Sequence, residues 1–494
     1  MTDVCLILEG TYPYVSGGVS SWVNDLMRRL SDTTFSVAYL GAHNTKEKKM
    51  YYTLPENVHD FYEVDIFDYF LASASRTRKQ KEDFEVIEAF LRSVYETDIS
   101  QFDQLVEILN PRDDNKRIGV QDLAYSWESW KILERAYLRQ AQEHSFIDYF
   151  WTWRSLYLPF FNLVGLDLPQ SRIYHAVSTG YAGVLGAVAK HKYRRPFLLT
   201  EHGIYTRERK IDISQADWIH SSLAKELKVT DDSDYFKDWW SRVFMFMSRL
   251  AYERADEIIT LYEGNRKTQI EEGASPHKTR IIPNGVSLSD VPVIDRRQRL
   301  RPFKVGFVGR VVPIKDVKTF ITACQSVYSE FKEVEFYIMG PTDEDEEYFK
   351  ECILLTKMKG LEKVIHFTGN VQLREYYPKL DVVVLTSISE SQPLVILEAG
   401  AYGIPVVATD VGACSELVFG RSPEDKMLGD SGSITPICSP HETAQAVLKI
   451  LKDSQLRIRM GETGRKRVGS YYRQEDYLAN YQMLYNRYQE YIHF

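Results

Sequence analysis

The sequence has few cysteines for its length, and they lie far apart. The five among 494 residues are Cys5, Cys324, Cys352, Cys414 and Cys438, with no Cys-x-x-Cys spacing. A disulfide framework or a structural zinc site needs cysteines grouped more closely than this. The pattern excludes both and favours inert thiols in a reducing compartment.

The chain also lacks an apolar run near the roughly 20 residues that a membrane-spanning helix needs. Its first ten residues carry Asp3 and Glu9, with neither a basic leader nor a cleavage site, so we interpret them as a buried strand. We therefore expect a cytoplasmic protein, in which peripheral contact with the inner membrane is made through partners.

An excess of positive charge is missing as well. The formal net charge of -8 argues against a general affinity for nucleic acid. With 44% hydrophobic and 26% charged residues, the composition is that of a folded globular protein, and 494 residues are too many for one ordinary core. Two or three domains are expected.

Two nucleotide-binding fingerprints are absent. The segment Gly306-Phe307-Val308-Gly309 contains two glycines but no G-x-G-x-x-G, and no G-x-x-x-x-G-K-[S/T] occurs anywhere. These absences exclude the dehydrogenase fingerprint and the P-loop.

What is present is an alternation of short apolar runs with longer amphipathic stretches, typical of parallel strands joined by helices. We expect strands at 4–8, 35–40, 173–177, 197–200 and 257–261, then at 304–308, 334–339, 364–368, 382–386 and 405–408. The predicted fold class is α/β, with two Rossmann-like domains.

The Pro283-Asn284-Gly285 turn marks the expected domain boundary. We assign residues 1–290 to an N-terminal domain, 291–470 to a C-terminal domain and 471–494 to a terminal helix. Residues 45–165 break the strand rhythm and predict a helical insertion, with helices near 82–96 and 123–143. Its aromatic stretch 146–161 is either a packed helix pair, which we favour, or a docking surface for a protein or membrane.

The strongest chemical pattern is Ser389 to Ala399, which follows the strand 382–386 and opens a helix. Amides at a helix start, here Leu394 and Val395, bind anions. Glu390 lies before the helix and Glu398 about one turn inside it. Each glutamate alone is explained by the helix dipole, but the pair is suited to gripping the hydroxyls of a diphosphate-linked sugar.

Two cations, Arg310 and Lys315, follow the strand 304–308. On a strand-to-helix loop both can neutralise a diphosphate, although solvated surface cations give the same pattern. The acidic run at Asp343-Glu344-Asp345 has the D-x-D shape of metal-dependent transferases. We interpret it as a solvated loop, because no converging ligand is identifiable.

In the first half, Gly17-Gly18 follows the first strand and lets backbone approach an oxyanion closely, although such pairs also mark plain turns. His202 follows the strand 197–200, and ligands of open α/β sheets bind at that end of the strands. A lone histidine is more often structural. Arg207 and Arg209 come next and are candidates for binding an acceptor.

Taken in order, these motifs resemble those of the GT-B glycosyltransferases of family four. The resemblance is carried by Gly17-Gly18-Val19, Glu201-His202-Gly203, 282–286, Gly309-Arg310 with Lys315, 367–369, Glu390 with Glu398, and 403–412. It covers most of the chain apart from the insertion. It implies an active site in a cleft between the domains, with the terminal helix crossing back to the N-terminal, acceptor-side domain.

The same resemblance implies a role for each residue. Arg310 and Lys315 hold the diphosphate, Glu398 the ribose and Glu390 the donor sugar. Backbone near Asn370 and Val371 reads uracil, and Gly340 is counted with these donor contacts. Gly17 and Gly18 approach the phosphates, and His202 lines the sugar pocket. The implied enzyme is a UDP-sugar-dependent retaining hexosyltransferase without cofactor or metal, whose catalytic residues are His202, Glu390, Arg310 and Lys315.

A narrower resemblance joins the opening 8–23 and the insertion to the cytosolic transferase of the Pel biofilm exopolysaccharide system. It implies a UDP-sugar and a glycan acceptor as substrates, and inner-membrane synthase subunits as partners through the aromatic insertion. Gln392-Pro393 departs from the Phe-Gly pair of many family members, and Pro393 has no N–H to donate. A catalytically silent nucleotide-sugar-binding or assembly subunit is the alternative.

Overall fold

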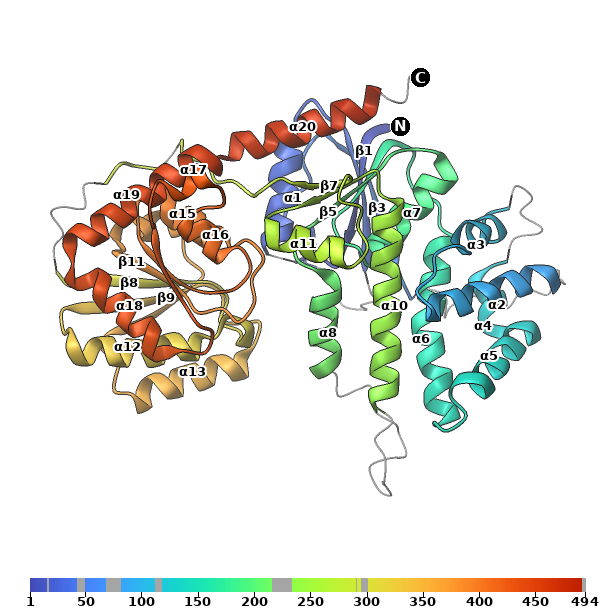
Figure 1. The fold of residues 1–494 in the computed structure, drawn as a ribbon, viewed down its shortest axis with the longest axis horizontal. Helices are drawn as coiled ribbons and strands as arrows, with labels where there is room; N and C mark the ends of the chain where they lie inside the picture. Colours follow the sequence, from blue (N-terminus) through green and yellow to red (C-terminus); the bar gives the residue numbers. More distant parts are fainter. Residues whose placement is uncertain are drawn as a thin grey trace. The chain divides into compact units, whose positions relative to one another are not determined.

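The computed structural model describes residues 1–15, 17–41, 49–67, 81–111, 118–215, 233–289, 291–294 and 301–490. The chain divides into two compact units, each with its own parallel sheet (Figure 1). The first unit comprises Met1–Ile281 with Tyr481–Phe494, and the second comprises Ile282–Asn480.

The sheet of the first unit has the strand order β3-β2-β1-β4-β5-β6-β7, with every pair parallel. The strands are β1 (Thr2–Glu9), β2 (Phe35–Gly41), β3 (Val58–Asp65), β4 (Ser171–Ala176), β5 (Phe197–Glu201), β6 (Glu257–Thr260) and β7 (Thr279–Ile281). The chain starts at β1, winds outward to β3 and then returns to β4. Neighbouring strands β1 and β4 therefore form a topological switch point, where α/β sheets bind ligands.

Helices cover this sheet and explain its apolar strands. They are α1 (Gly18–Arg29), α7 (Tyr181–Tyr193), α8 (Tyr205–Gln215), α10 (Ser233–Arg254) and α11 (Glu263–Glu271). Residues Val4 to Leu8 of β1 are fully buried. A strand enclosed on both faces must be apolar along its whole length, and that is the run visible in the sequence.

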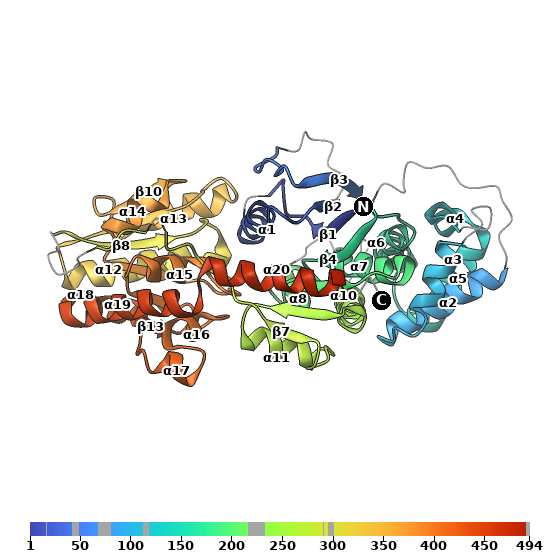
Figure 2. The same cartoon turned by 90° about the horizontal axis from the view of Figure 1, so that it is seen from above.

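The predicted insertion forms a group of helices at one side of the first unit (Figures 1 and 2). They are α2 (Lys81–Tyr95), α3 (Phe102–Leu109), α4 (Val120–Tyr125), α5 (Trp127–Gln140) and α6 (Phe146–Val164). Phe90 of α2 stacks on Phe160 of α6 and meets Phe246 of α10 edge-on. The aromatic stretch therefore packs into the core, while Trp127 and Trp151 remain 63% and 56% exposed.

Two expectations about the first unit need correction. The insertion does not begin at residue 45, because β3 lies inside that range and pairs with β2. β3 is an edge strand with a single buried side chain, that of Val64, so its sequence lacks an apolar run. The single helix expected over 123–143 is two helices, since Ser126 ends α4 and its Oγ accepts a hydrogen bond from the Ser129 N–H at the start of α5. The edge strand β7 also escaped prediction.

The sheet of the second unit has the order β10-β9-β8-β11-β12-β13, again parallel. Its strands are β8 (Phe303–Val308), β9 (Val334–Met339), β10 (Ile365–Gly369), β11 (Val382–Leu385), β12 (Val406–Thr409) and β13 (Gly432–Thr435). The structure thus confirms the α/β class with two Rossmann-like domains. The short edge strand β13 was not predicted.

Helices pack on this second sheet in two groups. One joins α12 (Val317–Glu330), α13 (Glu346–Met358) and α18 (Pro440–Lys452). The other joins α15 (Leu394–Ala401), α16 (Cys414–Phe419) and α19 (Ser454–Tyr471). Short turns complete the unit: η3 (Pro313–Lys315), α14 (Leu373–Tyr376), η4 (Tyr377–Lys379) and α17 (Pro423–Lys426).

Glycines allow α15 and α19 to approach closely. A Cβ added at Gly461 would lie 2.2 Å from the carbonyl oxygen of Gly403, and one at Gly400 would lie 3.2 Å from that of Gly464. Any side chain at Gly461 would push the helices apart. The position of α15 in the second unit is therefore set by its contact with α19.

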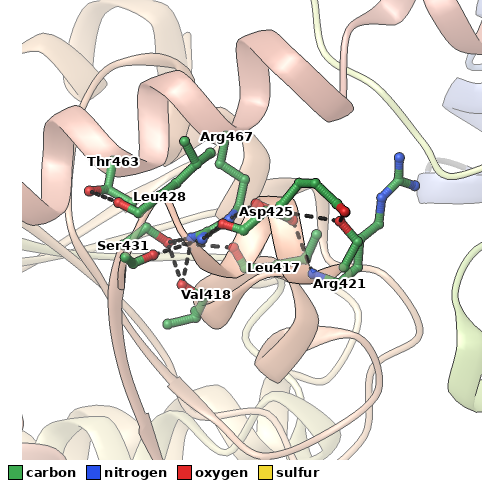
Figure 3. Close-up of polar contacts among 11 residues, drawn as sticks. Leu417, Val418, Arg421, Asp425, Leu428, Ser431, Thr463 and Arg467 are labelled. Carbon is green, nitrogen blue, oxygen red and sulfur yellow. Dashed lines mark hydrogen bonds and ion pairs between the residues drawn. The ribbon is translucent and has the colours of Figure 1, made fainter.

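A buried ion pair fixes α19 in turn. Arg467 of α19 lies with its Nε 2.6 Å from Asp425 Oδ1, and both side chains are almost fully buried (Figure 3). The same guanidinium donates to the carbonyl oxygens of Val418 and Gly429 and to Ser431 Oγ. All N–H donors of this guanidinium are satisfied by acceptors on α17, the loop after it and the end of α16, so Arg467 ties α19 to these three segments.

The last helix, α20 (Gln474–Glu490), ends in the first unit. Tyr485 OH bonds His175 Nδ1 at 2.8 Å, and Tyr481 OH bonds Thr200 Oγ1 at 3.0 Å. His175 Nε2 also bonds Thr200, and burial lowers the pKa of His175 to about 3. The histidine is thus neutral and joins α20 to the sheet. Among the described helices, none has the length and apolar character to cross a membrane.

Removal of the Asp425 carboxylate tests the buried pair. Asp425→Ala leaves the Arg467 charge buried without its partner, and we expect a loss of about 3–5 kcal/mol in the free energy of unfolding of the second unit. Replacing both residues by apolar ones should recover most of it. Urea unfolding followed by circular dichroism measures the change. Glu330→Ala, which breaks the exposed pair with Lys452, is the control; an equal loss there would contradict the assignment.

Candidate functional site

Five loops follow β8 to β12 at one edge of the second sheet, and they carry most of the predicted site residues. Backbone hydrogen bonds join neighbouring loops: Gly309 N–H donates to Met339 O, and Gly340 N–H donates to Gly369 O, both at 2.9 Å. Carboxyl ends of parallel strands form the ligand-binding edge of open α/β sheets. The residues predicted from separate motifs are therefore assembled on one surface.

Glycine is required where these loops touch. A Cβ at Gly340 would lie 2.1 Å from Gly309 O, and one at Gly412, whose φ is +54°, would lie 2.3 Å from Glu390 O. Both positions exclude a side chain by contact, and Gly412 also by its left-handed backbone. Gly340 therefore shapes the loop edge, and Gly412 holds the backbone of Glu390.

Lys315 and Glu390 are brought together from two loops. Lys315 Nζ donates to Glu390 Oε1 at 2.5 Å, and Ser387 Oγ donates to the same oxygen at 2.6 Å. The two charged side chains are only 19% and 12% exposed. The ammonium group of Lys315 and the carboxylate of Glu390 are thus held in fixed orientations at this edge of the sheet.

Glu398 lies in the first turns of α15, half-buried, where Tyr377 OH donates to its Oε2 at 2.5 Å. Burial raises the pKa of this carboxyl, and the tyrosine hydrogen bond works against that rise. Tyr377 was missed in the sequence, because a tyrosine in a short 3-10 turn carries no pattern that links it to a glutamate 21 residues later. The hydrogen bond from Tyr377 holds the Glu398 carboxylate in one orientation.

The start of α15 provides the predicted amides. The helix begins at Leu394, so the N–H groups of Leu394 and Val395 precede the first in-helix acceptors. Pro393 occupies the cap position with a φ of -70°, where the absence of an N–H removes no helical bond. Buried Gln392 accepts the Asn284 N–H at 2.7 Å, which links the interdomain turn to this loop.

The remaining predicted residues of the second unit lie nearby but are more open. Arg310 forms an ion pair with Glu344 at 2.6 Å, and both side chains are at least 40% exposed. Asn370 is exposed and Val371 half-buried, just after β10. The acidic run is surface loop and helix cap, because Asp345 Oδ1 accepts from the Tyr348 N–H. Among the described residues, no three His, Cys, Asp or Glu side chains group to hold a metal.

In the first unit, the predicted Gly17 and Gly18 stand where α1 begins, Gly17 as its cap. His202 follows β5, half-buried, with its ring 4.7 Å from that of Trp22 in an edge-on contact. Burial lowers the pKa of His202 to about 4, so its ring is neutral near pH 7. These residues lie at the carboxyl edge of the first sheet.

Sequence reasoning missed a buried carboxylate at this same edge. Glu201 accepts hydrogen bonds from Tyr252 OH at 2.7 Å, Gln269 Nε2 at 2.9 Å and the Tyr205 N–H at 3.0 Å. Burial nonetheless raises the pKa of Glu201 to about 7. The position directly before His202 was the available clue, but its donors come from distant elements.

A second missed carboxylate, Glu9, ends β1. Tyr205 OH donates to Glu9 Oε1 at 3.0 Å, and the Ala182 N–H at the start of α7 donates to Oε2 at 3.3 Å. Burial raises the pKa of Glu9 as well. Tyr205 therefore links the carboxylates that end β1 and β5, across the switch point of the sheet.

Comparison with known sequences now places the chain. Residues 2–277, more than half of it, match the family described as "Domain of unknown function (DUF3492)". The chain belongs to the DUF3492 family. Residues 294–467 match glycosyl transferases group 1. With the two-sheet fold, these matches support a GT-B glycosyltransferase.

Curated relatives are more distant. An uncharacterized 41.2 kDa protein of the cps region of Klebsiella pneumoniae is 23% identical over 51% of this chain and 67% of its own length. The MMP alpha-(1->4)-mannosyltransferase of Mycolicibacterium hassiacum is 24% identical over 55% and 61%. A D-inositol 3-phosphate glycosyltransferase of Kineococcus radiotolerans is 27% identical over 44% and 54%. The chain thus spans between half and two thirds of the length of these relatives.

Solved structures share the fold of this DUF3492 family member. Anabaena Alr3699/HepE in complex with UDP and glucose has a TM-score of 0.58 at 16% identity, covering 98% of this chain and 99% of that one. Sucrose-phosphate synthase from Thermosynechococcus elongatus has a TM-score of 0.58 at 16% identity, covering 98% of both chains. At this identity the likeness shows the fold alone.

The raised pKa of Glu201 gives a pH dependence of stability. Because the folded state binds this proton more tightly than the unfolded state, its contribution is present below the ordinary pKa and is lost as pH rises through about 7. We expect the unfolding free energy to fall more steeply between about pH 5 and about pH 7.5 in the native chain than in Glu201→Gln. Urea unfolding across that range measures it, with exposed Glu143→Gln as control. Identical slopes in all three proteins would contradict it.

Proposed function

We propose that this protein is a UDP-sugar-dependent, retaining glycosyltransferase that moves a hexosyl or N-acetylhexosaminyl unit to a growing exopolysaccharide, as a PelF-like, family-four enzyme. The observation that carries the proposal is the grouping of Lys315 with Glu390, Tyr377 with Glu398 and the start of α15 on the loops of one sheet edge. Structures of the same fold that hold UDP and glucose or UDP-glucose support the choice of donor.

In this proposal the second unit binds the donor. Lys315 and the amides of Leu394 and Val395 face the diphosphate, Glu398 the ribose, and Glu390 the hydroxyls of the sugar. Arg310 leaves its surface pair with Glu344 to join the phosphates, and the backbone of Gly340, Asn370 and Val371 contacts the nucleoside. Lys315 then neutralises the charge of Glu390 before the donor binds and the charge of the diphosphate afterwards.

The transfer step requires stabilisation of the negative charge on the departing UDP. A lysine, an arginine and helix amides supply positive charge there without a metal ion. In this proposal the acceptor hydroxyl attacks the anomeric carbon from the face that the leaving phosphate vacates, which retains the anomeric configuration. The leaving phosphate takes up the proton of that hydroxyl. In the first unit we assign Gly17 and Gly18 to the phosphates, and neutral His202 to a hydroxyl of the sugar.

The partners belong to the proposal too. Trp127 and Trp151, both more than half exposed on the helical insertion, support a docking role for that face. We propose that it meets inner-membrane subunits of a polysaccharide synthase on the cytoplasmic side. A silent nucleotide-sugar-binding or assembly subunit would use the same surface. It differs in having no turnover.

Calorimetry tests the donor site. Purified protein should bind UDP in preference to ADP and GDP, equally with and without magnesium. Lys315→Ala and Glu398→Ala should each weaken UDP by on the order of tenfold or more, because each removes a charge-assisted contact. Lys318→Ala and Glu351→Ala, which break an exposed pair on α12 and α13, are matched controls. Unchanged UDP affinity in the first two variants would reject this donor site.

Product stereochemistry tests the reaction. With the UDP-sugar that binds best and a glycan acceptor, proton NMR of the first product should show the anomeric configuration of the donor. Glu390→Gln should lower kcat roughly a hundredfold or more while UDP itself still binds. An inverted product would reject retention, a glycosyl-enzyme adduct seen by mass spectrometry would reject front-side attack, and binding without turnover would favour the silent subunit.

A further inference from the structure

The first unit has a hollow of about 720 Å³ at the edge of its sheet opposite to Gly17, Gly18 and His202. It is lined by the end of α7, the residues just before β5 and β6, and parts of α3, α10 and α20. Pro196 and Asp256, which precede β5 and β6, place it at the amino edge of the sheet. Substrates of open α/β sheets bind at the carboxyl edge, so this hollow is a separate feature.

Its lining is strongly cationic in a chain whose net charge is -8. Five cations face two carboxylates, Asp103 and Asp256; the cations are Lys190, Arg194, Arg195, Arg254 and Arg487. His191 and Tyr488 complete the polar wall. Three of the five cations form ion pairs with carboxylates, so the uncompensated positive charge, which attracts an anion, is that of Arg194 and Arg195.

Some of these cations are held in place by carboxylates. Lys190 Nζ lies 2.6 Å from Asp256 Oδ1, and Asp256 also accepts the Phe197 N–H. Arg254 lies 3.0 Å from Asp103, and Arg487 forms an ion pair with Glu257. These contacts fix the walls before any ligand binds. Fixed donors lose less entropy on binding than mobile ones.

Two arginines of the hollow differ from these cations in their ion pairing. Within the part of the chain that the structure describes, Arg194 and Arg195 have no carboxylate within ion-pair distance. Arg194 is exposed, and Arg195 is half-buried. Nearby, burial and then the charge of Lys190 lower the pKa of Lys278, which is a further sign of crowded positive charge.

A helix dipole does not explain the whole set. Lys190 and His191 lie in the last turn of α7, where cations are favoured. Arg254 and Arg487 likewise lie in the last turns of α10 and α20, whereas Arg195 lies in the loop before β5. Helix ends thus account for Lys190, His191, Arg254 and Arg487, but Arg195 lies outside any helix end.

We propose that this hollow binds a phosphate-bearing ligand, either a soluble diphosphate-type anion or the phosphate of a lipid headgroup. Arginine presents planar pairs of N–H donors that match phosphate oxygens, and at least two guanidiniums here lack a competing carboxylate. Tyr488 adds a hydroxyl, whose oxygen lies 3.3 Å from Glu257, and an aromatic face. The site is distinct from the donor site and stands whether or not the proposed function does.

Titration with inorganic pyrophosphate in the presence of saturating UDP tests the soluble source, because UDP occupies the donor site. The full chain should bind pyrophosphate, less tightly as salt rises. Arg194→Gln combined with Arg195→Gln should weaken it on the order of tenfold or more. Lys350→Gln combined with Lys357→Gln removes the same charge from α13 and should change nothing.

Co-sedimentation with phosphatidylcholine vesicles, with and without phosphatidylglycerol, tests the lipid source on the same proteins. Loss of either pyrophosphate or phosphatidylglycerol binding in the Arg194/Arg195 variant, but not in the α13 control, supports the site and identifies its source. Absence of both activities, or equal binding by both double variants, overturns the proposal. If UDP does not bind, pyrophosphate is titrated alone, and the same comparison still decides.

Discussion

The second unit depends on the buried contact between Arg467 and Asp425. One guanidinium ties α19 to α17 and to the loops around it, and α19 in turn determines where α15 lies, because glycines bring the two helices into backbone contact. α15 carries Glu398 and the amides at its start. A fully buried charge pair tolerates little displacement, since separating its partners leaves a charge without solvent or counter-ion. The positions of Glu398 and of these amides therefore depend on a contact that other helices of the second unit make.

At the site itself, the main physical theme is charge held in a fixed direction. Lys315, Ser387 and Glu390 form a compact group, and Tyr377 restrains Glu398 in the same way. Charges held in fixed directions interact with an anion without the reorganisation that water would need. Gly340 and Gly412 make the arrangement possible, because any side chain there would separate the loops.

The first unit carries different kinds of titratable group at the two edges of one sheet. At the carboxyl edge, Glu9 and Glu201 are buried carboxylates whose pKa values are raised, and Tyr205 connects them. At the amino edge, arginines and lysines surround a hollow. Helix α20 reinforces the same sheet through neutral His175.

The sequence by itself determined the two parallel sheets, because strands buried on both faces must be apolar throughout, and β1, β8 and β11 show this locally. It also indicated that Lys315, Glu390 and Glu398 follow such strands on loops or near a helix start, since these are local features. Only the tertiary structure supplied the edge strands β3, β7 and β13 and the partners Tyr377 and Asp425. Those contacts join residues far apart in the chain, and pairing across such distances leaves no periodicity in a single sequence.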